Sequence, residues 1–257
     1  MPGPPVASGK SLCHNSGVQI GSAGLSGSRR LLSVAITSLA GFLGLAAIAA
    51  GKQLSGLDHA TQTLVQLAHD PLLDAAMNGI SGLGENYGLV SLIALGVALL
   101  WHRSRRWALV LPLLMAGTGG LQLVAKWAVD RPRPNLAAWG FPSGHVLSLV
   151  VFFGLATYLL CTSTLTRRWR WLGTAGSVAT VLAVAFSRLY LEAHWLSDVA
   201  GGFMLGIAYL LGAICLVETV ARRAADARVS SAQKRMFTLP TTNGPAPTSI
   251  RLSLRSE

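Results

Sequence analysis

Six long apolar segments constrain the fold of this chain more than any other feature of its sequence. Each approaches the roughly 17 to 25 helical residues that cross about 30 Å of hydrocarbon. Backbone polar groups inside a membrane must be hydrogen-bonded, which favours helices. The stretches between the segments are brief, so the sequence predicts an all-α, polytopic bundle of six transmembrane helices. The expected spans are 31–50, 87–101, 107–124, 145–161, 171–186 and 199–220, of which the second and fifth are short.

The composition also indicates a membrane protein. Hydrophobic residues make up 51% of the 257 residues and charged ones only 12%, whereas a soluble domain has about 25% charged residues. This excludes an ordinary cytosolic enzyme, which needs a polar surface, and a wholly disordered chain, which needs low hydrophobicity. The three cysteines, Cys13, Cys161 and Cys215, lie far apart and predict neither a disulfide framework nor a metal cluster.

The formal net charge of +11 would fit a nucleic-acid partner, but its distribution favours another explanation. If the six spans alternate, sixteen of the 21 basic residues fall on the side of the two termini and five on the other side. The net charges are then +13 and −2. Cytoplasmic loops carry the excess of Lys and Arg in membrane proteins, so both termini are predicted to be cytoplasmic. No nucleic-acid partner is expected.

The chain is predicted to be one membrane domain, residues 31–220, between two tails. Residues 1–30 are rich in Gly, Ser and Pro, and residues 221–257 are basic and include the stretch TTNGPAPTS. Both tails are therefore expected to be cytoplasmic and mostly disordered. Ala47-Ile48-Ala49 resembles a signal-peptidase site. Cleavage there stays open as an alternative to the uncleaved anchor that we favour.

The segment between the first two spans predicts two short amphipathic helices on the outer membrane surface. Apolar residues recur at helical spacing, among them Leu57 and Leu64, and Asp70-Pro71 is typical of an N-cap followed by a first helical residue. His59 and His69 are expected on a solvated face, without a chemical role.

Charged and polar residues gather at the outer ends of the later spans, where charge bias should have removed basic residues. The group comprises Lys126, Arg131, Arg133, Ser143, Gly144, His145, Arg188, His194 and Asp198. Lys and Arg supply the countercharge that a phosphate needs, and Arg can bind two of its oxygens with its planar fork. These residues predict a site for a multiply charged anion.

Two local patterns support the anion site. One is a typical helix start with Ser143 as N-cap, in Phe141-Pro142-Ser143-Gly144-His145. The free backbone N–H groups of a helix start attract anions, and Gly144 permits an anion to approach the backbone closely. His194 and Asp198 are four residues apart, which predicts that they share one helix face. The carboxylate can then fix the imidazole tautomer and leave the other nitrogen free to attack.

Three motifs together resemble the tripartite signature of the type 2 phosphatidic acid phosphatase superfamily. They are Lys126 followed by six residues and Arg133-Pro134; Pro142-Ser143-Gly144-His145; and Ser187-Arg188 followed by five residues, His194, three residues and Asp198. All three occur in order and at the family's spacing. The resemblance extends over about residues 31–220 and implies an integral membrane lipid phosphatase of bacterial type.

The resemblance also implies roles for the site residues. His194 would be the nucleophile that forms a phosphohistidine, Asp198 would orient it, and His145 would be the general acid and then the base. The phosphate oxygens would be held by Lys126, Arg133, Ser143, Gly144 and Arg188. No metal or other cofactor is expected. Arg131 has no assigned role, and we interpret it as facing lipid headgroups.

The predicted function is hydrolysis of a phosphomonoester or diphosphate lipid at the outer face of the bacterial inner membrane, facing the periplasm or cell exterior. We expect undecaprenyl diphosphate first, then phosphatidic acid or phosphatidylglycerol phosphate. One alternative is a lipid transporter or flippase that binds anionic headgroups without hydrolysis, although Pro112 and Gly117–Gly120 are weak signals for a transport path. Another is a vanadate haloperoxidase, but those enzymes are larger and soluble. The sequence does not predict an oligomeric state.

Overall fold

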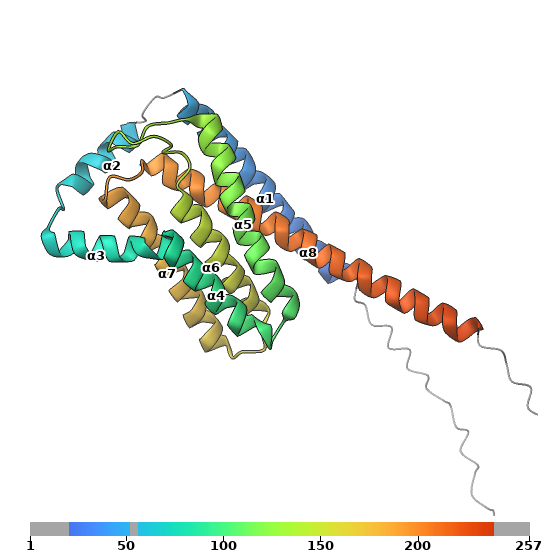
Figure 1. The fold of residues 1–257 in the computed structure, drawn as a ribbon. Helices are drawn as coiled ribbons and strands as arrows, with labels where there is room; N and C mark the ends of the chain where they lie inside the picture. The colour runs from blue at the N-terminus through green and yellow to red at the C-terminus, as the bar shows by residue number, and fades with distance from the viewer. Residues whose placement is uncertain (1–20, 52–55, 239–257) are drawn as a thin grey trace, which may run out of the picture. The chain divides into compact units, whose positions relative to one another are not determined.

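The computed structural model describes residues 21–51 and 56–238, and these form helices without a strand. The helices are α1 (Gly21–Ala50), α2 (Gly56–Gln66), α3 (Pro71–Ser81), the 3₁₀ turn η1 (Gly82–Gly84), α4 (Asn86–Trp101), α5 (Arg105–Val129), α6 (Gly144–Thr162), α7 (Arg167–Tyr190) and α8 (Leu196–Thr238) (Figure 1). The predicted all-α fold is confirmed. Cys13 and the outer parts of both predicted tails lie outside the described residues.

The chain divides into two units, Met1–Cys215 and Leu216–Glu257, and the bundle belongs to the first. Helix extends into both segments that were predicted as tails, since residues 21–30 belong to α1 and residues 221–238 to α8. The tail boundaries themselves stay predictions.

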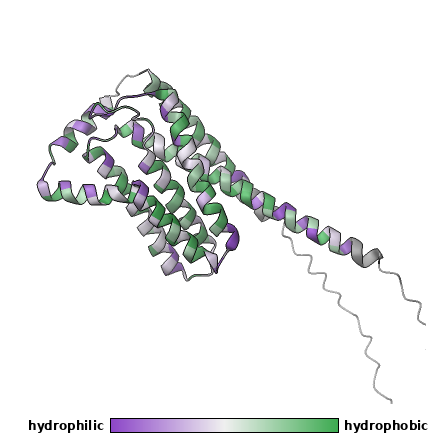
Figure 2. Cartoon of the chain, viewed as in Figure 1, coloured by the Kyte–Doolittle hydropathy of each residue, from purple (hydrophilic) through white to green (hydrophobic). Residues whose placement is uncertain are grey.

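Five helical segments are each long and apolar enough to cross a membrane: Gly27–Ala50, Arg105–Val129, Gly144–Thr162, Arg167–Tyr190 and Leu196–Gln233. The second predicted span, α4, has 16 residues. It is long and apolar enough to cross a membrane only together with Pro71–Gly84, from which it is bent by 54°. By length and composition, the described residues thus contain five possible spans, or six if the bent pair is one span. Figure 2 shows hydrophobic residues along the bundle helices and hydrophilic ones at the turns between them.

The fifth predicted span is longer than its apolar core suggested. The helix α7 has 24 residues, because it continues through arginines and tryptophans at its start and through Ser187 and Arg188 near its end. Long basic side chains and Trp are amphipathic, so they extend a spanning helix without interrupting it.

The two predicted helices between the first spans are present as α2 and α3. Asp70 is the N-cap of α3, where its carboxylate accepts hydrogen bonds from the backbone N–H groups of Leu72 and Leu73, and Pro71 is the first helical residue. His59 and His69 are exposed as expected. Both rings lie against aromatic residues, His59 against Trp195 and His69 against Tyr190.

Helix α6 packs between α5, α7 and α8, and most of its first half is buried. The core around it consists of Val65, Val146, Leu149, Val150, Val181, Val184, Ala185, Leu189, Tyr190 and Val199. On α8, Gly202 allows the closest approach to α6. A Cβ atom at this position would lie 2.7 Å from the carbonyl oxygen of Ser143 and 3.1 Å from Cβ of Val146. The start of α6 is therefore fixed against the start of α8.

Candidate active site

Four helix ends meet at one end of the bundle. Helices α5 to α8 run alternately in opposite directions, so the end of α5, the start of α6, the end of α7 and the start of α8 lie together (Figure 1). All eight site residues predicted from the sequence lie on these ends or on the two loops that join them: Lys126, Arg133, Ser143, Gly144, His145, Arg188, His194 and Asp198.

His194 lies in the turn between α7 and α8 and is 1% exposed. The prediction that it shares a helix face with Asp198 is wrong, because α8 begins only at Leu196. The turn nevertheless brings Nδ1 of His194 to 3.5 Å from Oδ2 of Asp198. Burial lowers the pKa of His194 to about 4; the Asp198 carboxylate opposes this shift, while Arg188 and Arg133 add to it. His194 is therefore neutral at pH 7, as a nucleophile must be.

Asp198 is fully buried and held from several directions. Its Oδ2 accepts a hydrogen bond from the backbone N–H of Trp195 at 3.0 Å, and its Oδ1 accepts one from Nη1 of Arg131 at 3.0 Å. Its backbone carbonyl accepts from the N–H of Ser143 at 3.0 Å, which joins the second and third motifs directly. The carboxylate beside His194 thus has little freedom to move.

The cations of the motifs lie near the pair of His194 and Asp198. Lys126 is buried at the end of α5, where its Nζ donates to the carbonyl of Trp139 at 3.1 Å. Arg188 is buried and donates to Oγ of Ser81. Lys126 interacts electrostatically with both Arg133 and Arg188, and His194 does as well. Three like charges that interact with one another beside the His194–Asp198 pair favour an anion among them.

Several buried polar atoms at the motif residues have no hydrogen-bond partner among the described residues. Six buried side-chain nitrogen or oxygen atoms have no hydrogen-bond partner in the described part of the chain. Four of them belong to predicted site residues: Nε of Arg133, Oγ of Ser143, Nε of Arg188 and Nδ1 of His194. Nδ1 of His194 faces Asp198 at 3.5 Å. Buried polar groups are normally hydrogen-bonded, so the unpartnered atoms of Arg133, Ser143 and Arg188 indicate a place where a ligand binds.

The start of α6 has the form predicted for it. Ser143 is the N-cap residue, but its hydroxyl makes no capping hydrogen bond. A Cβ atom at Gly144 would lie 1.9 Å from Oε1 of Gln122, so only glycine fits beside that side chain without a shift. Nε2 of His145 lies 3.0 Å from Oε1 of Glu85, the residue before α4. The sequence reasoning missed Glu85, since it lies 60 positions before His145 and outside the motifs.

Arg131 does not face lipid headgroups, and that interpretation is wrong. Its side chain is 2% exposed and makes ion pairs with Asp58 at 2.9 Å and with Asp198 at 3.0 Å. Two buried carboxylates hold it inside the protein, where an unpaired cation would be unstable. Asp58 was also missed. The repeated Arg-Pro of the first motif was the sequence signal for Arg131, whereas Asp58 lies 73 positions away and had none.

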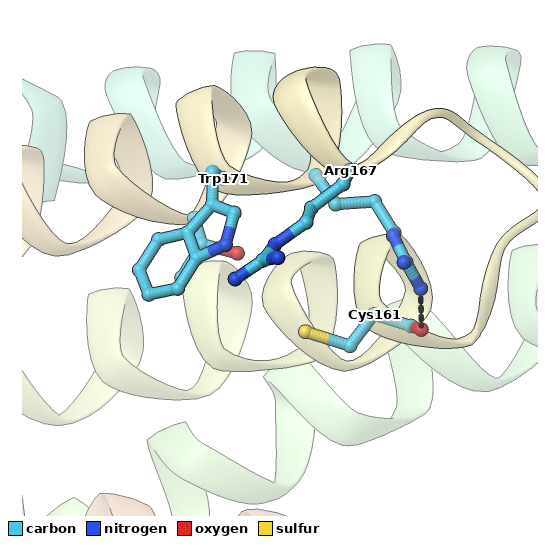
Figure 3. Close-up of a pocket in the computed structure, with 5 residues that line it drawn as sticks. Cys161, Arg167 and Trp171 are labelled. Atoms are coloured by element: carbon cyan, nitrogen blue, oxygen red, sulfur yellow. Dashed lines mark hydrogen bonds between the residues drawn. The ribbon is translucent and has the colours of Figure 1, made fainter.

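A cavity at the opposite end of the bundle is not this site. It has a volume of about 280 Å³ and is lined by Cys161, Arg167, Arg170, Trp171 and Thr174 (Figure 3). Arg170 donates there to the carbonyl of Cys161 at 3.1 Å. Cys161 and His145 lie near opposite ends of α6, which are about 24 Å apart at 1.5 Å per residue. None of the motif residues lines this cavity.

Comparison with known proteins identifies the family. Residues 107–222 match the PAP2 superfamily and include all three motifs. Phosphatidylglycerophosphatase B of Bacillus subtilis is 32% identical over 177 residues, which are 65% of this chain and 86% of that protein. The chain belongs to the PAP2 superfamily. The predicted family is thus confirmed, and this PAP2 protein is a phosphatase, as its relatives are named.

Other known proteins are also similar to this chain. The undecaprenyl-diphosphatase of Sulfolobus acidocaldarius is 27% identical over 168 residues, 61% of this chain and 76% of that protein. The crystal structure of a transmembrane PAP2-type phosphatidylglycerolphosphate phosphatase from Bacillus subtilis superposes with a TM-score of 0.63 at 25% identity, over 74% of this chain and 96% of that one. LpxE of Aquifex aeolicus shares the fold, with a TM-score of 0.50 at 22% identity over 63% and 96%.

Proposed function

We propose that this PAP2 phosphatase hydrolyses a lipid phosphate or lipid diphosphate through a phosphohistidine on His194. The observation that best supports the proposal is the set of unpartnered buried atoms on Arg133, Ser143 and Arg188. These three side chains can hold phosphate oxygens, and His194 is a neutral imidazole beside a carboxylate.

In the first step, Nε2 of His194 attacks phosphorus, because its Nδ1 faces Asp198. The P–N bond forms as the P–O bond to the lipid breaks, and protonated His145 gives its proton to the departing lipid oxygen. Asp198 stabilises the positive charge on the imidazole. Lys126, Arg133 and Arg188 stabilise the negative charge on the transferred phosphoryl group, where positioned cations lower the barrier most.

In the second step, water attacks the phosphohistidine. His145 takes a proton from that water, the P–N bond breaks and inorganic phosphate leaves with the neutral imidazole restored. Glu85 lies 3.0 Å from Nε2 of His145, where its carboxylate can pair with the imidazolium. No step calls on a metal ion; in the described ranges, no three His, Cys, Asp or Glu side chains are grouped to hold one.

The active site faces the periplasm or cell exterior in this proposal, with both termini in the cytoplasm of a bacterial cell. The support is the positive-inside distribution of Lys and Arg. The substrate then has its headgroup at the outer surface and its chain among the helices. Undecaprenyl diphosphate and phosphatidylglycerol phosphate are the first candidates, since relatives are named for those two activities, and phosphatidic acid is the third.

The test is phosphate release by the purified full-length protein in detergent, with each lipid in turn and a chelator present. His194→Ala should lose at least about 1,000-fold in kcat, because it lacks the nucleophile. His102→Ala, an exposed histidine at the opposite end of the bundle, is the matched control and should be fully active. Acid-labile phosphate should be trapped on the wild type but not on His194→Ala. Equal activity of the two histidine variants would overturn the proposal.

A further inference from the structure

Asp58 is a buried carboxylate on α2, a helix that no part of the signature includes. It is 2% exposed, although its neighbour Leu57 is 71% exposed. Its Oδ1 accepts a hydrogen bond from the backbone N–H of Ser197 at 2.9 Å. Its Oδ2 accepts from the hydroxyl of Ser197 at 2.8 Å and from Nη2 of Arg131 at 2.9 Å. These three donors come from the segments that contain the first and third motifs.

The contact with Ser197 caps the helix that contains Asp198. The carbonyl of Trp195 accepts hydrogen bonds from the N–H groups of Asp198 and Val199, so Trp195 is the N-cap residue of α8. Its indole has no oxygen with which to cap the free N–H groups. Asp58 supplies that oxygen from another helix, while Asp198 accepts from the N–H of Trp195. Together they form a capping box divided between α2 and α8.

Arg131 joins the two carboxylates. Its Nη1 donates to Oδ1 of Asp198 at 3.0 Å and to the hydroxyl of Ser197 at 2.6 Å, while Nη2 donates to Asp58. Burial raises the pKa of Asp58, but the hydrogen bonds from Ser197 and Arg131 outweigh burial and hold its pKa below the usual value. Asp58 is therefore ionised. Without its charge, the buried guanidinium would be drawn toward Asp198.

We propose that Asp58 is a positioning residue for this phosphatase, holding the carboxylate of Asp198 beside His194 through Arg131 and Ser197. The inference rests on the proposed function, in which Asp198 orients His194. It assigns a role to α2, whose own residues do not touch the reacting atoms. A shift of about 1 Å in a positioned group can cost about 100-fold in rate.

The experiment compares full-length wild type with Asp58→Asn, which keeps the shape of the side chain and removes its charge. We expect kcat to fall by about tenfold to 100-fold with KM within about twofold, because phosphate binding by Lys126, Arg133 and Arg188 is unaffected. Asp74→Asn is the matched control. Its carboxylate, on α3, is bonded to Tyr190 and His69 instead, and it should keep wild-type kcat.

A double-mutant cycle distinguishes positioning from a general loss of stability. In the Asp198→Asn background, adding Asp58→Asn should lower kcat by less than about twofold, since the carboxylate that Asp58 positions is gone. A full and independent loss in that background would overturn the proposal, as would a folded Asp58→Asn enzyme with wild-type kcat.

If Asp58→Asn does not fold, Ser197→Ala tests the positioning role instead, because it removes the bridging hydroxyl and keeps every charge. A lower kcat at unchanged KM supports positioning, and an unchanged kcat overturns it. Failure of the proposed function gives a different result, in which His194→Ala is as active as the wild type. An active wild type, an inactive His194→Ala and an unaffected Asp58→Asn would refute the positioning role alone.

Discussion

The two ends of the bundle both contain several arginines, but the arginines differ in burial. At the motif end, Arg131 and Arg188 are buried, each bonded to side chains from other helices. At the opposite end, Arg105 and Arg167 are exposed, and Arg105 lies over the ring of Trp101 at 5.7 Å. Burying a charge costs several kcal/mol unless it is paired, whereas an exposed charge costs little. A buried arginine therefore needs a partner, which two carboxylates supply for Arg131 and which the proposed phosphate would supply for Arg188. The exposed arginines fit the proposed membrane orientation.

The largest expected contrast between the ends is in their accessibility from outside the cell. In a background with Cys13, Cys161 and Cys215 changed to Ser, Asn135→Cys places a thiol in the exposed α5–α6 loop and Thr164→Cys one in the exposed α6–α7 turn. A membrane-impermeant maleimide should label Asn135→Cys in intact cells and Thr164→Cys only after lysis. The reverse pattern would place the motif end in the cytoplasm and contradict the proposed orientation.

Removing one arginine from each end should separate catalysis from orientation. Arg188→Ala should lower kcat/KM by about 100- to 1,000-fold, the usual effect of deleting a donor to a developing oxyanion. Arg167→Ala at the opposite end should keep wild-type kcat/KM. Both variants are measured for phosphate release after size-exclusion chromatography confirms folding. Comparable losses in the two would mean that arginine burial does not distinguish the site.

The pH dependence should reflect the burial of His194. Burial lowers its pKa to about 4, against about 6.5 for an unperturbed histidine, so the neutral nucleophile persists as the pH falls from 7 to 5. We expect the acid limb of kcat/KM to lie near pH 4. Asp198 raises the pKa of His194, so Asp198→Asn should move the limb to still lower pH. An acid limb near the unperturbed value would contradict a buried, neutral His194.

Local patterns predicted the motif end well, and contacts distant in sequence were missed. Ser143 as N-cap and Asp70-Pro71 as a helix start followed from residues a few positions apart. Asp58 bonds Ser197 across 139 positions, and no periodicity encodes such a contact. The shared helix face of His194 and Asp198 was wrong for a related reason. The helix starts only at Leu196, and the oxygen that accepts from the N–H of Ser197 in its first turn belongs to Asp58 on α2, which the local sequence does not reveal.

The smallest expected difference between the motif end and the rest of the bundle concerns two glycines on α8. A Cβ atom at Gly202 would lie 2.7 Å from the backbone oxygen of Ser143, at the motif end, whereas one at Gly212 would meet nothing within 4 Å. Gly202→Ala should therefore destabilise the protein by about 1–3 kcal/mol and lower kcat, because the start of α6 must shift. Gly212→Ala should be neutral or slightly stabilising, since alanine favours helix. Thermal unfolding in detergent measures both, and equal melting temperatures would show that the motif end tolerates movement of α6 relative to α8.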